Sequence, residues 1–154
     1  MERKLTIEDA RQSLTAHAAE KGLQAFEKYG PNLGWNELKQ LLQDPSLVRY
    51  PCEVIFDSNG LLPGELAHPF PQGDTPEDGF KLHIQPRFLS RLDQVPAIVL
   101  YQLVLVNYGE FAAAEDAEAF GAAALGLTKE QYYEMLCGLA DRCGKEGDGG
   151  SSAA

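Results

Sequence analysis

The chain has 154 residues, of which 44% are hydrophobic, and its 23 acidic against 13 basic residues give a net charge of −10. This length suits one domain with a single core, and the apolar content excludes intrinsic disorder of the whole chain. The negative charge excludes nucleic acid and anionic membrane surfaces as expected partners, because both carry charge of the same sign.

Two amphipathic helices are predicted in the first part of the chain. Thr6 and Asp9 have the spacing of an N-terminal cap, and apolar residues follow at helical intervals until Gly30 and Pro31 end the pattern. A shorter helix is predicted over residues 35–42 from the same kind of spacing. The chain opens on charged residues rather than on an apolar secretory signal, so a cytoplasmic location is expected.

The middle of the chain predicts a small sheet of three or four strands. A strand over residues 52–56 is predicted to pair with a second one over 61–67 through a tight turn, as an irregular hairpin. The segment from His68 to Gly79 is rich in Pro, Gly and acidic residues and is expected to be a loop. The alternation of apolar and polar residues over 80–85 predicts the clearest strand.

The segment from Val95 to Tyr108 is predicted to be the central helix. It contains no charged residue and is apolar on every side, so we expect it to be buried all round. Asp93 is placed to cap its start, Pro96 falls in the first turn, and Gly109 is expected to end it. At about fourteen residues it is shorter than the ~20 that a bilayer-spanning helix needs.

Two further helices are predicted after the central one. An alanine-rich helix is expected over about 112–125, and a capping box at Thr128 and Gln131 predicts a last helix that ends near Gly144. The order of elements therefore predicts an α+β fold, with helices flanking a small sheet, in a single domain over 1–144. Residues 145–154 have little to bury and are expected to form a flexible C-terminal tail.

Four polar residues interrupt the central helix, namely Tyr101, Gln102, Asn107 and Tyr108. Buried polar groups need hydrogen-bond partners, so these positions are the informative ones. In one interpretation the tyrosine rings pack in the core while both amides bond to neighbouring loops. In the other, the polar side chains line a pocket, with Tyr101 and Gln102 near the point where a cleft would open beside the sheet.

The order of a helix, a small sheet ending in strand 80–85, a central helix and a further helix resembles the minimal core of the zincin metallopeptidases. In that family the central helix carries His-Glu-x-x-His, whose histidines bind zinc while its glutamate acts as general base. The matching positions here read Tyr101-Gln102-Leu103-Val104-Leu105, and a register one residue later offers no nitrogen ligand either. The resemblance therefore implies a zincin-like fold without peptidase activity, metal or cofactor.

An acidic segment lies in the helix that follows. In the gluzincin branch of that family a downstream carboxylate is the third zinc ligand, and Glu115 or Glu118 is the matching position. One carboxylate without two histidines is not a zinc site, so the segment is expected to be a solvated helix face. An alternative is an acidic adaptor surface, Glu110 to Glu118, that binds a basic partner in a salt-dependent manner.

The three cysteines, Cys52, Cys137 and Cys143, match no common zinc or redox spacing. In a protein expected in the cytoplasm such cysteines are reduced, so we predict structural thiols. The sequence also contains no glycine-rich phosphate loop and no nucleophile elbow. It therefore predicts neither a cofactor nor a known catalytic motif.

The leading hypothesis is a non-catalytic, zincin-like protein that binds a protein partner or a small ligand. Its expected binding residues are Tyr101 and Gln102 of the central helix together with His83 on strand 80–85 and His68 before it. The alternative is a metal-dependent hydrolase that uses His68, His83 and a carboxylate. The third histidine, His17, lies on the first helix and is expected at the surface. The sequence does not predict the oligomeric state.

Overall fold

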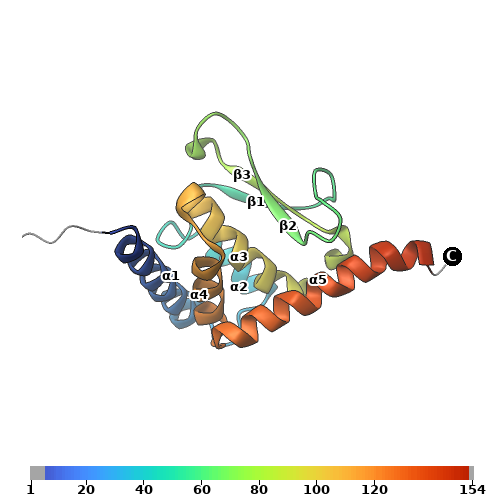
Figure 1. Cartoon of the computed structure of the whole chain (residues 1–154). Coiled ribbons are helices and arrows are strands. Elements are labelled where there is room, and N and C mark those ends of the chain that lie inside the picture. The colour runs from blue at the N-terminus through green and yellow to red at the C-terminus, as the bar shows by residue number, and fades with distance from the viewer. Residues whose placement is uncertain (1–5, 153–154) are drawn as a thin grey trace, which may run out of the picture.

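The protein is described here from a computed structural model that covers the backbone of residues 6–152 and the surroundings of side chains from Thr6 to Asp141. Over this range it has an α+β fold with five α-helices and three β-strands, in the predicted order of two helices, a sheet and three helices (Figure 1). The elements are α1 (Ile7–Tyr29), α2 (Trp35–Leu41), β1 (Cys52–Phe56), β2 (Ala67–Pro71), β3 (Phe80–Ile84), α3 (Val95–Tyr108), α4 (Ala114–Leu125) and α5 (Lys129–Ser152).

The sheet has the strand order β1-β3-β2, so the predicted hairpin between the first two strands is wrong. β1 runs parallel to β3, whereas β2 runs antiparallel to it with His68 opposite His83. The predicted strand at 80–85 is confirmed as β3 (Phe80–Ile84), and it is the central strand of the sheet. Its apolar face lies against the core, where Leu82 and Ile84 are fully buried. The second strand is Ala67–Pro71 rather than 61–67, so the expected loop after His68 is wrong in its first part.

β2 contains Pro69 and Pro71, which is why its sequence is typical of a loop. The N–H of Gln85 donates to the Leu66 carbonyl at 3.1 Å, and these two residues are the next opposed pair after Ala67 and Ile84. Because hydrogen-bonded pairs alternate along an antiparallel ladder, the even-numbered residues of β2 bond to β3. Both prolines therefore fall at positions that face the free edge, where no N–H is needed for the ladder. They also leave few donors there for the addition of another strand.

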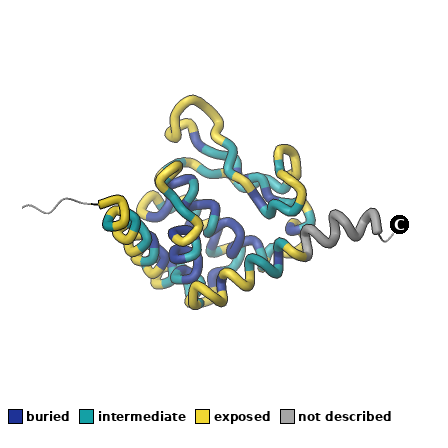
Figure 2. Tube along the Cα trace, viewed as in Figure 1, coloured by how far each residue is buried: buried dark blue, intermediate teal, exposed yellow. Residues whose placement is uncertain are grey.

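α3 is the buried centre of the fold, as predicted. Of its 14 residues, 11 are buried, and Figure 2 shows it between the sheet and the outer helices. Pro96 lies in the first turn, and Gly109 ends the helix with a φ of +57°. The predicted cap by Asp93 is wrong. The chain enters the helix through a short 3₁₀ turn, Leu92–Gln94, whereas a side-chain cap needs an extended residue before the first turn.

The predicted caps of the first and last helices are confirmed. The hydroxyl of Thr6 accepts from the N–H of Asp9 at 3.0 Å, and that of Thr128 accepts from the N–H of Gln131 at 3.0 Å. The backbone of α5 continues through Gly144 to Ser152, beyond the predicted end, because glycine weakens a helix without breaking it. The predicted flexibility of residues 145–154 stays a prediction, and their side chains lie outside the described residues.

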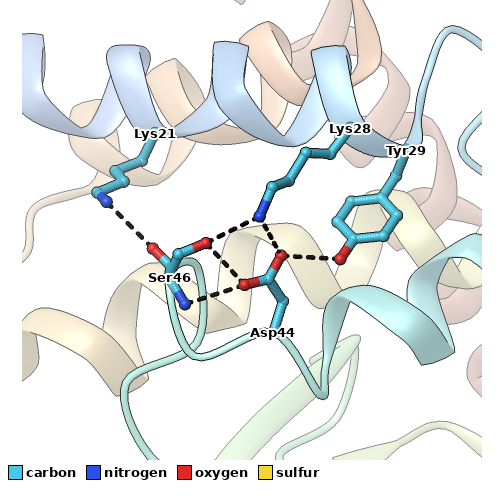
Figure 3. A network of polar contacts seen from close by, with 5 residues as sticks. All are labelled: Lys21, Lys28, Tyr29, Asp44 and Ser46. Carbon is cyan, nitrogen blue, oxygen red and sulfur yellow. Dashed lines mark hydrogen bonds and ion pairs between the residues drawn. The ribbon is translucent and has the colours of Figure 1, made fainter.

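A polar network joins the loop after α2 to α1 (Figure 3). The Asp44 carboxylate accepts from Lys28 Nζ and from the Tyr29 hydroxyl, both at 2.8 Å, and from the Ser46 hydroxyl at 2.6 Å. Lys21 Nζ donates to the Ser46 carbonyl at 3.1 Å. The bonds from Lys28 and then Ser46 hold the pKa of Asp44 far below its ordinary value. The ionised carboxylate therefore stabilises the fold.

Asp44→Asn is expected to destabilise the protein by about 1–2 kcal/mol at neutral pH. Because the pKa of Asp44 is lower in the folded chain than in the unfolded chain, its stabilisation is complete above the unfolded pKa. It is lost as the pH falls toward the folded pKa. Thermal unfolding of both proteins should show a constant difference above about pH 5 and a shrinking one below about pH 4. A difference that does not change with pH would contradict this role.

Candidate functional site

A cavity of about 380 Å³ lies between α3, α5 and the start of β2, and we call it the α5 cavity. α3 lines it with Ile98, Tyr101, Gln102 and Leu105, and α5 lines it with Tyr133, Leu136, Cys137 and Ala140. The segment 64–68 and Glu118 of α4 complete the wall. Most of these groups are apolar, so the cavity presents a hydrophobic wall with a few polar side chains.

The structure brings three of the four predicted binding residues to this cavity. Tyr101, Gln102 and His68 line it, whereas His83 does not. β3 is the middle strand of the sheet, so β2 stands between it and the cavity, and His83 lies on the face opposite buried Leu82. His83 Nδ1 is 2.9 Å from the Asn59 carbonyl oxygen, which fixes its ring there.

The two amides of α3 have different surroundings. Asn107 is satisfied, because its Nδ2 donates to the Leu47 carbonyl and its Oδ1 accepts from the N–H of Arg49, each at 2.9 Å. Gln102 is 8% exposed, and its Oε1 has no hydrogen-bond partner among the residues that the structure describes. Such an acceptor costs free energy in a protein interior, so Gln102 is the polar group of the cavity wall that most needs a donor.

Glu118 supplies negative charge to the same wall. It is half-buried, and within the described range no cation pairs with its carboxylate. Burial, and then the Glu118 carboxylate, raise the pKa of Tyr101. The second carboxylate, Glu65, lies 3.3 Å from His68 Nδ1. Among the described residues neither Lys nor Arg lines the cavity, so its charged groups favour a cation.

Tyr132 closes the α5 side of the core beneath this cavity. Its side chain is fully buried, and its hydroxyl donates to the Ala97 carbonyl at 2.6 Å. Burial raises its pKa well above the ordinary value, so the hydroxyl stays protonated. This bond ties α5 to the first turn of α3.

The α5 residues that line the cavity were not predicted as binding residues, although their spacing in the sequence indicates a shared helix face. Tyr133, Leu136, Cys137 and Ala140 are spaced at intervals of three, one and three, which places them on one face of a helix. Glu65 carries no comparable signal, because its position depends on how the segment before β2 folds back.

The histidines form no metal site in this arrangement. His68 and His83 lie opposite each other on neighbouring strands. The centroid of the Phe70 ring is 4.8 Å from that of His68 and 4.7 Å from that of His83. In the part of the chain that the structure describes, no three His, Cys, Asp or Glu side chains are grouped so that they could hold a metal ion. The rings of His68 and His83 pack beside Phe70 on the face of the sheet that is opposite Leu82. The third histidine, His17, packs against the ring of Tyr108.

The cysteines differ in their surroundings. Burial raises the pKa of the Cys52 thiol to about 11, and its Sγ lies 3.4 Å from the Tyr50 carbonyl oxygen. A thiol of that pKa is a poor nucleophile at neutral pH, as a structural role requires. Cys137 is half-buried and lines the α5 cavity. Cys143 lies outside the residues whose side chains are described.

The acidic segment of α4 was predicted to be a solvated helix face, but one of its carboxylates is buried. Asp116 is fully buried and accepts from Arg11 Nη1 and Thr15 Oγ1, both at 2.5 Å, and from the N–H of Ala113 at 2.8 Å. Glu115 remains exposed. The prediction is wrong at position 116 because α1 packs over this part of α4 and supplies the donors.

Comparison with models of protein families, with curated proteins and with solved structures finds no match to this chain. Among the residues described here, no helix combines the length and the apolar character needed to cross a membrane.

Proposed function

We propose that the chain is a non-catalytic binding protein whose α5 cavity takes a small organic amine with an apolar body. The observation that carries this proposal is the pair of Glu118 and Gln102. A half-buried carboxylate and a buried amide oxygen, both without a partner among the described residues, line the same largely apolar cavity. Such a pair of acceptors suits a ligand that brings N–H donors and positive charge.

The dimensions of the cavity favour a small molecule over a peptide. Its volume of about 380 Å³ lies within the range of small-molecule sites, roughly 300–1,000 Å³. A peptide strand would have to pair with the free edge of β2, where Pro69 and Pro71 offer no N–H. A compact ligand that enters between α3 and α5 avoids this obstacle.

A zincin-like arrangement forms part of the proposal. The antiparallel edge strand β2, the buried helix α3 and Glu118 on the next helix support it, since they stand in the order that the resemblance requires. In this interpretation Tyr101 occupies the place of the first zinc ligand and Gln102 that of the general base, and an amine occupies the place of the metal. The hydrolase alternative with His68 and His83 is not favoured, because these rings pack beside Phe70 on the sheet.

Ligands that share a shape and differ in charge test this proposal. 2-Phenylethylamine, 2-phenylethanol and 3-phenylpropanoate present the same ring with a cation, a neutral donor and an anion. Because a ligand that binds the folded state raises its stability, thermal unfolding reports on affinity. The amine is expected to raise the melting temperature most and the alcohol less, while the carboxylate leaves it unchanged. Equal responses to the three compounds would contradict the proposal.

Glu118→Gln is the decisive variant, since it keeps the side-chain size and removes the charge. A charge-assisted hydrogen bond exceeds a neutral one by about 1 kcal/mol or more, so the amine should bind roughly tenfold more weakly to this variant. The response to the alcohol should persist. Glu115→Gln, a matched control on the exposed part of the same helix, should behave as the unmodified protein does. An unchanged amine response in Glu118→Gln would rule out Glu118 as the anchor.

A further inference from the structure

A second cavity of about 310 Å³ lies on the α1 side of the molecule, and we call it the α1 cavity. It is enclosed by α1, the loop between α2 and β1, the C-terminal end of α3 and Phe120 of α4. Its ionisable lining residues are His17, Lys21, Arg49 and Tyr108, and none of the described residues that line it is acidic. In a chain with 23 acidic residues, this makes the α1 cavity opposite in charge to the α5 cavity.

The two permanent cations of the α1 cavity are held in place without being neutralised. Lys21 Nζ donates to the Ser46 carbonyl at 3.1 Å, and Arg49 Nη1 donates to the Asn107 carbonyl at 3.1 Å. Both acceptors are neutral, and within the described residues neither cation pairs with a carboxylate. Lys28, by contrast, is paired with Asp44 at 2.8 Å. Each cation of the cavity therefore keeps N–H donors for another partner.

The loop that carries these groups is fixed from both ends. Figure 3 shows Asp44 bonded to Ser46, whose carbonyl in turn receives Lys21. At the other end Asn107, which is 7% exposed, bonds to Leu47 and to the N–H of Arg49. Because the loop is bonded at both ends, its position is set before any ligand arrives, which lowers the entropy lost on binding.

We propose that the α1 cavity binds a small organic phosphate. A phosphate dianion matches two fixed cations, and guanidinium and ammonium groups are the side chains that most often bind phosphate in proteins. The Tyr108 hydroxyl is a further donor, since burial raises its pKa and keeps it protonated. Leu47 and Phe120 give the cavity an apolar wall for the body of the ligand. This proposal is independent of the α5 cavity.

Calorimetric titration with phenyl phosphate, inorganic phosphate and benzoate tests this inference. Phenyl phosphate is expected to bind saturably at one site, and added salt should weaken it because the contacts are ionic. Inorganic phosphate lacks the apolar body and benzoate lacks the second charge, so each should bind about tenfold or more weakly. Absence of saturable phenyl phosphate binding would overturn the proposal. Inorganic phosphate or benzoate binding equally well would overturn the assigned ligand class.

Lys21→Gln and Arg49→Gln should each weaken phenyl phosphate binding about tenfold or more. Lys39→Gln is the matched control, because Lys39 lies on α2 outside the cavity and its replacement causes the same change in net charge. Circular dichroism establishes that each variant is folded. An equal loss in Lys39→Gln would show that only net charge matters and would overturn the site. Glu118→Gln should leave phosphate binding unchanged, so the two cavities are tested separately.

Discussion

Asp116→Ala is expected to lower the free energy of unfolding by about 2–4 kcal/mol, because it removes a fully buried carboxylate to which three groups donate. Asp116 is fully buried between α1 and α4, where Arg11, Thr15 and the N–H of Ala113 all donate to it. Without the carboxylate, the Ala113 N–H loses its acceptor, and the Thr15 hydroxyl keeps only the Arg11 carbonyl, 3.1 Å away. For a domain of this size, the loss corresponds to a drop of about 10 °C in melting temperature.

The neighbouring Glu115 provides a matched control for this substitution. Its carboxylate lies 4.0 Å from Arg11 Nε, and its side chain is 49% exposed. Exposed ion pairs contribute little, so Glu115→Ala should change the free energy of unfolding by less than about 1 kcal/mol. Urea unfolding of both variants measures the difference. Similar effects from the two substitutions would show that the buried carboxylate is not what joins α1 to α4.

Gly22→Ala is expected to destabilise the protein by at least about 2 kcal/mol, although alanine is the better helix former. Gly22 lies where α1 meets α4, and a Cβ added there would stand 2.3 Å from the Phe120 carbonyl oxygen and 2.8 Å from the Ala123 Cβ. A backbone oxygen cannot rotate away as a flexible side chain does. The two helices would have to separate, and the packing between them would be lost.

Gly138→Ala tests whether this effect comes from the contact. Gly138 lies within α5, and a Cβ added there meets nothing within 4 Å. The same substitution should therefore stabilise the protein by about 0.5–1 kcal/mol through helix propensity. Thermal and urea unfolding of the two variants should give changes of opposite sign. A stabilising or neutral Gly22→Ala would mean that α1 and α4 are not packed as closely as described.

The helices could be predicted from the sequence because their signals are local. Capping boxes at Thr6 and Thr128 set two helix starts, and Gly109 and Gly126 end two helices. The pairing of the strands could not be predicted in this way. β1 pairs with β3 rather than with the strand next in sequence, and nothing near Cys52–Phe56 specifies that partner.

Only those residues of the candidate site that have a local signal in the sequence could be predicted. Tyr101 and Gln102 stand out as polar residues in an apolar helix, which is visible in the sequence. Whether a given amide is satisfied depends on a distant loop, since the partners of Asn107 are 58 and 60 residues away. The buried state of Asp116 likewise depends on α1, about a hundred residues earlier in the chain. Such contacts follow from the tertiary fold and from no local pattern.

Heteronuclear NMR of nitrogen-labelled protein tests the binding proposal most directly, because the side-chain amides of α3 report on the α5 cavity and on the opposite side of the helix. Titration with 2-phenylethylamine should shift the side-chain amide signals of Gln102 saturably. Those of Asn107, whose oxygen and nitrogen are both bonded to the loop before β1, should stay in place. Unmoved Gln102 signals, or equal shifts at Gln102 and Asn107, would contradict an amine site in the α5 cavity.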